Sequence, residues 1–240
     1  VTFEWGRSWA TNESVANIFA TRLPATLTVM LPILILDALL ALPVAMWVAY
    51  RRGSLADRSI MVITTVALSI SFLVYVIVGQ YVFGFQLGWF PVQGWSDSVW
   101  TNLRVYAPLP VLLAVAVSLA PTTRLYRTFF LDEIGHDYVR TARAKGLTEN
   151  VIMLKHVLRN AMIPILTNVA VALPGIFVGS FLIEVFFSIP GLGREVILAV
   201  NRSDYPVIQA LTVYLAFLTM LINLAVDILY KLVDPRVVLK

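Results

Sequence analysis

The sequence has no cysteine, few charged residues and only two histidines, and each scarcity excludes something. Without cysteine, the 240 residues can form neither a disulfide nor a thiolate metal site. Charged residues make up 13% of the chain, whereas soluble domains average about 25%. His136 and His156 lie twenty residues apart and outside any H-E-x-x-H pattern, so we expect no metal, cofactor or catalytic role for them.

Apolar side chains fill the place of the missing charges. The chain is 59% hydrophobic, with a mean hydropathy of +0.83, which is typical of a protein that lies in the bilayer. Five stretches are long enough to cross about 30 Å of hydrocarbon, and none shows strand-like alternation, so each predicts a helix. The predicted spans are 26–50, 59–83, 107–125, 162–187 and 207–232. The fold class is therefore an all-α, polytopic membrane helical bundle.

The distribution of cations predicts the orientation of these spans. Segments 51–58, 122–160 and 231–240 carry 13 of the 18 Lys and Arg residues. Because cations concentrate in cytoplasmic loops, we expect the loop 126–161 and the tail 233–240 to be cytoplasmic, and the segment 1–25 to be external. An external, polar start without a signal peptide predicts a further helix upstream, which would give six spans in the full-length protein.

Tryptophan and tyrosine gather in the segments predicted to be external. They form either an interfacial aromatic belt or a substrate vestibule. The residues concerned are Trp5, Trp9, Trp89, Trp95, Trp100 and Tyr106.

The loop 126–161 interrupts the apolar pattern with a basic helical sequence. A short helix is predicted over 137–145, with Gly146 as a left-handed residue directly after it. Thr148 is expected to cap a second helix, with Glu149 in its first turn. Such a knob suits docking into a groove of a partner protein, although an ordinary basic loop held by anionic lipid has the same composition.

Within this loop, Arg140-Thr-Ala-Arg-Ala-Lys-Gly146 is followed by His156-Val-Leu-Arg-Asn-Ala-Met-Ile-Pro164. The pair resembles the EAA loop of ATP-binding-cassette importer permeases, in the variant of the dipeptide and oligopeptide branch. Ala142 and Gly146 match the general pattern. Arg140 and Thr141 replace its first two residues, and Arg159 stands where it has a proline.

Further similarities run along the chain. Glu184-Val-Phe-Phe-Ser-Ile-Pro-Gly-Leu-Gly193 is similar to the branch's turn after its penultimate span. Asp204-Tyr-Pro206, the stretch 223–227 and Asp234-Pro-Arg236 also fit the branch. Phe85-Gln-Leu-Gly-Trp-Phe-Pro91 and the opening residues are similar to the first, or B-type, of two permease subunits.

The resemblance implies a permease of the inner membrane of a prokaryote, with no enzymatic site of its own. Separate ATPase subunits would dock on the loop through Arg140, Thr141, Ala142, Arg143, Ala144, Lys145, Gly146 and Leu147. The chain has no G-x-x-x-x-G-K-[ST] phosphate loop, so ATP and Mg are expected on those subunits. The other implied partners are a C-type permease, an external substrate-binding protein and a peptide. No nucleic-acid partner is expected.

Three acidic residues in or near the spans are candidates for the pathway or its gates: Asp37, Glu184 and Asp227. Asp37 lies near the middle of its span, where an ionised carboxylate costs about 2.5–3.5 kcal/mol. The branch usually has an apolar residue at such a place. Asp37 is therefore either a pore-lining contact for a cationic amine, a structural partner of the second permease, or a neutral, hydrogen-bonded acid. Glu184 and Asp227 are interpreted mainly as packing or gate residues.

Two alternatives to a peptide importer remain at this stage. An ion-coupled secondary transporter would use Asp37 as its proton or sodium site and would need no ATPase. The same permease fold could also carry nickel, glutathione or an oligosaccharide.

Overall fold

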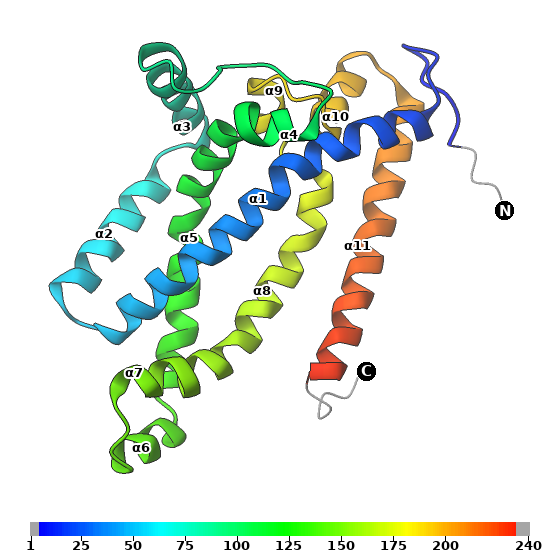
Figure 1. Ribbon diagram of the computed structural model, residues 1–240. Helices are drawn as coiled ribbons and strands as arrows, with labels where there is room; N and C mark the ends of the chain where they lie inside the picture. The colour runs from blue at the N-terminus through cyan, green and yellow to red at the C-terminus, as the bar shows by residue number, and fades with distance from the viewer. Residues whose placement is uncertain (1–4, 234–240) are drawn as a thin grey trace. The chain divides into compact units, whose positions relative to one another are not determined.

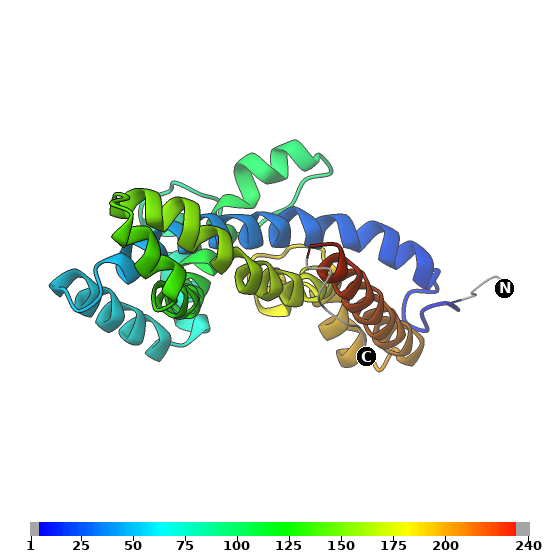
Figure 2. The same ribbon diagram turned by 90° about the horizontal axis from the view of Figure 1, so that it is seen from below.

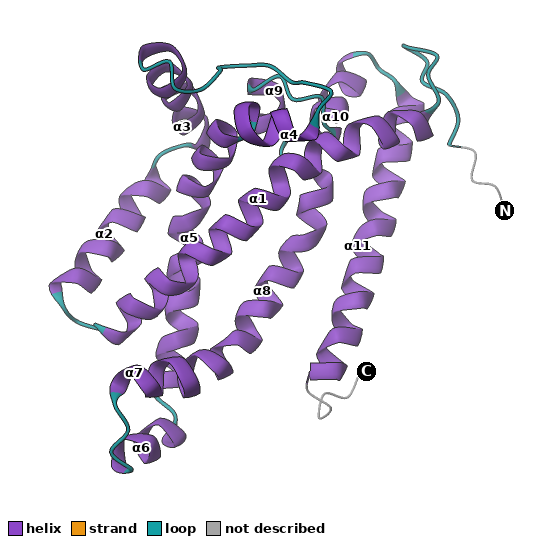
Figure 3. Ribbon diagram, viewed as in Figure 1, coloured by secondary structure: helices purple, strands orange, loops and turns teal. Residues whose placement is uncertain are grey.

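The computed structural model describes residues 5–233, except for the side chains at 178 and 226–233. Helices and the loops between them make up the described part of the chain, which holds no strand beyond an isolated bridge between Arg7 and Ser14 (Figure 3). The all-α fold is confirmed. The elements are α1 (Val15–Tyr50), α2 (Leu55–Ser69), α3 (Phe72–Gly79), η1 (Gln80–Gln86), α4 (Val99–Thr101), η2 (Asn102–Tyr106), α5 (Pro108–Ile134), α6 (Asp137–Ala144), α7 (Glu149–Val151), η3 (Ile152–Val157), α8 (Leu158–Val178), α9 (Phe181–Phe186), α10 (Leu192–Asn201) and α11 (Tyr205–Val233).

Four helices of the described chain are long and apolar enough to cross a bilayer. They are Val15–Tyr50, Pro108–Ile134, Glu149–Phe177 and Tyr205–Ala225. A fifth span results if α2 and the α3–η1 helix count as one, with a bend of 88° between them. The protein is therefore a multi-pass membrane protein.

The bend falls inside the predicted span 59–83, where the apolar sequence gives no warning of it. Ile70 has φ −91° and ψ 128°, an extended conformation that ends the hydrogen-bond ladder of α2. The carbonyl of Ala67 accepts the Ile70 N–H at 3.3 Å and the Tyr75 hydroxyl at 3.1 Å. Partners from both sides of the break thus satisfy a carbonyl that a straight helix would have bonded.

The predicted span 162–187 covers two helices rather than one. α8 ends at Val178, and α9 begins at Phe181. Gly179 between them has φ +75°, a conformation that L side chains rarely adopt and that commonly ends a helix. The first predicted span differs in the other direction, because α1 begins at Val15 and not at residue 26.

The chain forms two compact units, which are described separately. Unit 1 comprises the described residues of Val1–Pro32, Val76–Leu112 and Ala170–Lys240. In it α10 lies against α9 and α11 (Figure 1, Figure 2). Its core cluster consists of Val15, Ile18, Leu192, Ala199, Val207, Ala210 and Leu211.

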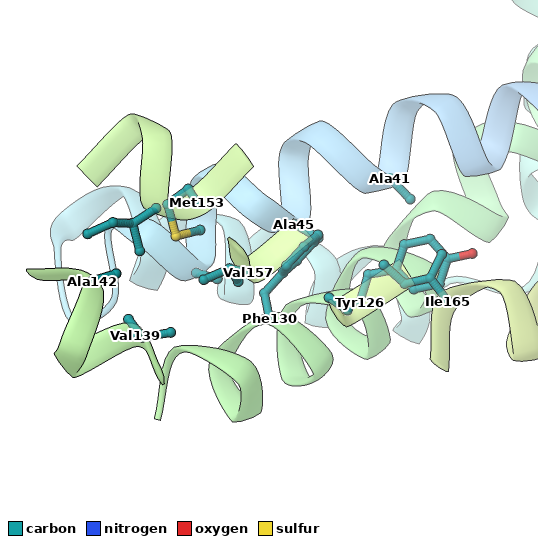
Figure 4. Close-up of a cluster of buried hydrophobic side chains, with 12 residues drawn as sticks. Ala41, Ala45, Tyr126, Phe130, Val139, Ala142, Met153, Val157 and Ile165 are labelled. Atoms are coloured by element: carbon teal, nitrogen blue, oxygen red, sulfur yellow. The ribbon is translucent and has the colours of Figure 1, made fainter. Parts of the chain in front are cut away.

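Unit 2 comprises Ile33–Tyr75 and Leu113–Val169. Its core cluster joins residues of α1, α5, α6, η3 and α8 (Figure 4). α1 contributes Ala41, Ala45 and Ala49, whose four-residue spacing places three small side chains on one face. Small residues allow close approach of helices in a membrane. α5 contributes the large side chains, Tyr126 and Phe130, which are almost completely buried.

Candidate functional site

The short helix α6 is fixed to the core of unit 2 by two side chains. Val139 is fully buried, and Ala142 is 6% exposed. Both belong to the same cluster as Met153 and Val157 of η3, and Figure 4 shows Val139, Ala142 and Met153 close together. Because these positions lie three residues apart on α6, one face of the helix is held and the opposite face is left open.

A left-handed glycine ends α6, as predicted. Lys145 is the C-cap residue, and Gly146 follows it with φ +76°. The Gly146 N–H donates to the carbonyl of Arg143 at 2.9 Å, and the Leu147 N–H donates to that of Ala142 at 3.3 Å. These bonds close the end of the helix and turn the chain toward Thr148. Thr148 occupies the N-cap position of α7, but its side chain makes no capping bond.

Ion pairs and hydrogen bonds brace the loop on either side of Gly146. The Arg143 guanidinium donates to both carboxylate oxygens of Glu149, at 2.7 and 3.2 Å, and this hydrogen bond raises the pKa of Arg143 above its ordinary value. The Tyr138 hydroxyl donates to Glu133 at 2.6 Å. Burial, together with that bond, raises the pKa of Tyr138 to about 12. Both ends of α6 are therefore tied to neighbouring helices.

The residues predicted to contact an ATPase do not all lie on one surface. Ala142 faces the core of the protein itself, and Arg143 is occupied by Glu149. The remaining predicted residues are exposed and surround the turn. They are Arg140, Thr141, Ala144, Lys145, Gly146 and Leu147, and we call them the α6 tip. Leu147 is the large apolar side chain of this set and is 39% exposed.

Asp37 meets two hydroxyl groups of α5. The Ser118 hydroxyl donates to Oδ1 at 2.8 Å, and the Thr122 hydroxyl donates to Oδ2 at 2.8 Å. Ser118 and Thr122 are four residues apart and so share a face of α5. Asp37 remains half-buried. Sequence reasoning singled out Asp37 but not its partners, although two hydroxyl residues at helical spacing in an apolar span were a usable signal.

Glu184 of α9 has a different setting, in which it is 1% exposed. The Thr26 hydroxyl donates to its Oε1 at 2.9 Å, and the Arg194 N–H donates to its Oε2 at 2.8 Å. The Thr26 oxygen in turn accepts the Leu192 N–H at 2.8 Å. These bonds link α1, α9 and the start of α10.

Three glycines make room for this carboxylate. A Cβ added at Gly191 would lie 2.5 Å from Glu184 Oε2, and one at Gly193 would lie 3.0 Å from it. A Cβ at Gly179 would overlap Glu184 Oε1. We call Gly179, Gly191 and Gly193 the glycine cradle. It gives a physical reason for the P-G-x-G sequence that follows Glu184.

The third acidic candidate, Asp227, lies where side chains fall outside the described residues. Sequence reasoning missed another buried acid, Asp57, which is 5% exposed. Arg127 donates to its two oxygens, each at 2.9 Å, and the Gly53 N–H donates at 2.9 Å. This pair joins the start of α2 to α5. Among the residues that the structure describes, no three His, Asp or Glu side chains come together as metal ligands.

The tryptophans of the predicted external segments differ in exposure. Trp9, Trp89 and Trp100 are 66–73% exposed. Trp95 instead lines a recess of about 290 Å³ in unit 1, beside Arg22 and Asp97. Arg22 forms an ion pair with Glu195, with 3.4 Å between Nε and Oε2.

The described residues form membrane spans, with a braced basic helix between two of them and carboxylates placed among the helices. This combination is that of a polytopic, permease-like membrane protein. A family model described as the binding-protein-dependent transport system inner membrane component matches residues 41–239, and the chain belongs to this family.

Named relatives agree with this assignment. The chain is 36% identical to the oligopeptide transport system permease protein AppB of Bacillus subtilis, over 93% of this chain and 72% of the relative. It is 34% identical to the di/tripeptide transport system permease protein DppB of Pseudomonas aeruginosa, over 97% and 76%. It is 35% identical to the dipeptide transport system permease protein DppB of Lactococcus lactis, over 95% and 73%.

Proposed function

We propose that this chain is the B-type permease subunit of an ATP-driven importer of di- and oligopeptides. Membership of the binding-protein-dependent family and the peptide permeases among its relatives support this proposal. The proposed partners are a C-type permease, two ATPase subunits that bind ATP and Mg, and a binding protein that delivers the peptide from outside.

The α6 tip is the proposed docking site of an ATPase subunit. The observation that carries this proposal is the division of α6 into two faces. Val139 and Ala142 hold one face in the core of unit 2, whereas the residues of the α6 tip are exposed. Lys145 gives the tip a positive charge, whereas Arg140 forms an exposed ion pair with Asp137 at 3.3 Å. Leu147 adds an apolar contact. A partner with an acidic cleft and an apolar floor would match these features.

A mechanical route leads from the tip into the spans. The cluster that holds α6 also contains residues of α1, α5 and α8. Cores are close-packed and transmit displacement rather than absorbing it. When the ATPases close on ATP, a pull on α6 would therefore move these helices together, and the pathway would alternate between inward-open and outward-open states. On this proposal the loop 126–161 is cytoplasmic and the segment 1–25 is external, as the cation distribution predicts.

Proline substitutions at two matched glycines test the docking proposal. Gly146 and Gly53 have φ +76° and +79°, both lack neighbours for an added Cβ within 4 Å, and each donates one N–H bond. Proline fixes φ near −65° and removes that donor at both sites. At Gly53 the acceptor that loses its partner is the buried Asp57, which keeps both bonds from Arg127, so the control is at least as severe. Only Gly146 belongs to the α6 tip.

We expect Gly146→Pro to insert in the membrane but to abolish peptide uptake, and to release the ATPase when the complex is purified in mild detergent. Gly53→Pro should keep both properties. ATP-dependent uptake by Gly146→Pro at the wild-type rate would refute the docking assignment. Mass spectrometry of the wild-type complex provides an independent check, since a chain without any ATPase companion would favour an ion-coupled transporter.

A further inference from the structure

Asp37 lies on the same face of α1 as the buried alanines 41, 45 and 49, where the facing side chains change from apolar to polar. On α1 it lies four residues before Ala41, and on α5 Ser118 and Thr122 lie four residues apart, ahead of Tyr126. One turn further along both helices, Ala41 and Tyr126 are buried members of the core cluster. At Asp37 itself the facing groups are a carboxylate and two hydroxyls. Asp37 thus lies at the edge of the core of unit 2 and not inside it.

The depth of this polar edge is that of the bilayer interior. α1 ends at Tyr50, thirteen residues beyond Asp37. At 1.5 Å per residue, Asp37 lies about 20 Å along the helix from Tyr50. The hydrocarbon core is about 30 Å thick, so a site at this position is surrounded by membrane unless it faces a water-filled path.

No cation of the described residues neutralises Asp37. The ion pairs found there join Arg22 to Glu195, Arg127 to Asp57, Arg140 to Asp137 and Arg143 to Glu149. A carboxylate at membrane depth that keeps its charge faces a partner cation, water or the transported molecule. Asp37 is half-buried, so the residue keeps part of its surface accessible.

The arrangement of oxygens suits an ammonium group. Each carboxylate oxygen of Asp37 accepts one hydroxyl hydrogen, whereas a carboxylate offers about four acceptor positions. The Ser118 and Thr122 oxygens also keep lone pairs after donating. An ammonium group has three donors and no acceptor, so it can use the carboxylate and both hydroxyl oxygens.

We propose that Asp37, Ser118 and Thr122 form a cation subsite of the transport pathway, which takes the ammonium group of a lysine side chain. This inference rests on the proposed function and adds a substrate preference to it. Peptides with additional positive charge should pass this permease more readily than neutral peptides of the same length.

Uptake of two peptides by the reconstituted, full-length complex tests the proposal. Trilysine and trialanine have the same length and differ in side-chain charge, and the binding protein is the same in every variant. The quantity measured is the ratio of the initial ATP-dependent uptake rates. We expect Asp37→Asn to lower the trilysine-to-trialanine ratio about tenfold, the loss expected for one charge-assisted hydrogen bond. Asp37→Glu should retain the ratio within about twofold.

Two neighbouring threonines provide the matched control. Thr122 donates to Asp37, whereas the buried Thr123 hydroxyl has no hydrogen-bond partner among the described residues. Thr122→Val should lower the ratio, and Thr123→Val should leave it unchanged.

An unchanged ratio in Asp37→Asn, with trialanine uptake retained, would overturn the cation subsite and leave the importer intact. An equal loss of both peptides, together with loss of the second permease on purification, would also overturn it and assign Asp37 to the interface between permeases. If the wild-type complex takes up neither peptide with ATP, or follows a proton gradient without ATP, the proposed function fails and this inference fails with it.

Discussion

Glu184 and Asp37 are two carboxylates in one apolar chain, and they have opposite environments. Glu184 is 1% exposed and is bonded to Thr26 and the Arg194 N–H inside the glycine cradle. Asp37 is half-buried, and its hydrogen-bond partners among the described residues are side-chain hydroxyls. The first carboxylate connects three helices of unit 1. Asp37 links α1 to α5, but neither of its hydroxyl partners depends on it for an acceptor.

The difference separates a structural acid from a candidate functional one. A buried acceptor that satisfies buried donors stabilises the fold, because removing it leaves those donors unpaired. The hydroxyls that bond Asp37 have other acceptors within reach. Ser118 lies 3.3 Å from the Val115 carbonyl, and Thr122 lies 2.9 Å from the Ser118 carbonyl. Removal of Asp37 should therefore affect transport more than stability.

The largest expected effect comes from truncating the two acids. Glu184→Ala leaves a void and unpairs the Thr26 hydroxyl and the Arg194 N–H, which should lower the free energy of unfolding by about 3–4 kcal/mol. Asp37→Ala should change the free energy of unfolding by less than about 1 kcal/mol, because the two hydroxyls can donate to backbone carbonyls of their own helix, α5. Thermal unfolding of the complex in detergent, followed by tryptophan fluorescence, compares the two variants. Equal melting temperatures would show that Glu184 stabilises the fold no more than Asp37 does.

The glycine cradle gives the next largest effect. In Gly193→Ala the new Cβ would lie 2.8 Å from the backbone nitrogen of Phe181, which cannot move without shifting α9. We expect a loss of about 2–3 kcal/mol, the upper part of the range for overpacking. Gly175→Ala in α8 is the control, since nothing lies within 4 Å of its added Cβ. It should be neutral, or stabilising by up to about 1 kcal/mol. A Gly193→Ala melting temperature equal to that of the control would show that α9 yields easily.

Local features of this molecule could be predicted from the sequence. The left-handed turn at Gly146 depends on a short helix followed by a glycine, and both are visible within ten residues. The apolar stretches that become α1, α5, α8 and α11 were also recognisable, because composition alone makes a span. The basic helix between two spans followed from the same local patterns.

Features that depend on distant partners could not be predicted. Asp37 bonds residues 81 and 85 positions away, so its setting depends on the register of α1 against α5. Ala142 was expected on the docking surface with Ala144, and only the packing of α6 shows that it faces the core. The break at Ile70 lies in an apolar sequence that is compatible with a straight helix. The P-G-x-G turn was visible, but the reason for its glycines required the position of Glu184.

A smaller effect is expected from a matched pair of threonines, one at each acid. Thr26 donates to Glu184 and accepts the Leu192 N–H, so Thr26→Val removes both bonds from a buried site. The expected loss is about 1–2 kcal/mol. Thr122→Val should cost less than about 1 kcal/mol, because Ser118 still donates to the half-buried Asp37. Melting temperatures of the two variants test this order, and a larger loss for Thr122→Val would make Asp37 the structural acid.

The smallest effect concerns Asp204, a buried acid that precedes α11 and lies outside the candidate spans. It is 3% exposed and accepts bonds from the Ser8 hydroxyl and from the N–H groups of Trp9 and Ala10. Burial opposes ionisation, but these hydrogen bonds outweigh it and hold the pKa of Asp204 below its ordinary value of 3.8.

A carboxyl whose pKa is lower in the folded state contributes stability above the unfolded pKa and loses it as the pH falls through the folded one. The melting temperature of wild type should therefore exceed that of Asp204→Asn at pH 7, and the difference should shrink only below about pH 4. Asp97→Asn, in an exposed loop position, is the control and should match wild type in melting temperature at pH 7. If Asp204→Asn matches wild type at pH 7, the segment that carries Ser8 does not depend on this carboxylate.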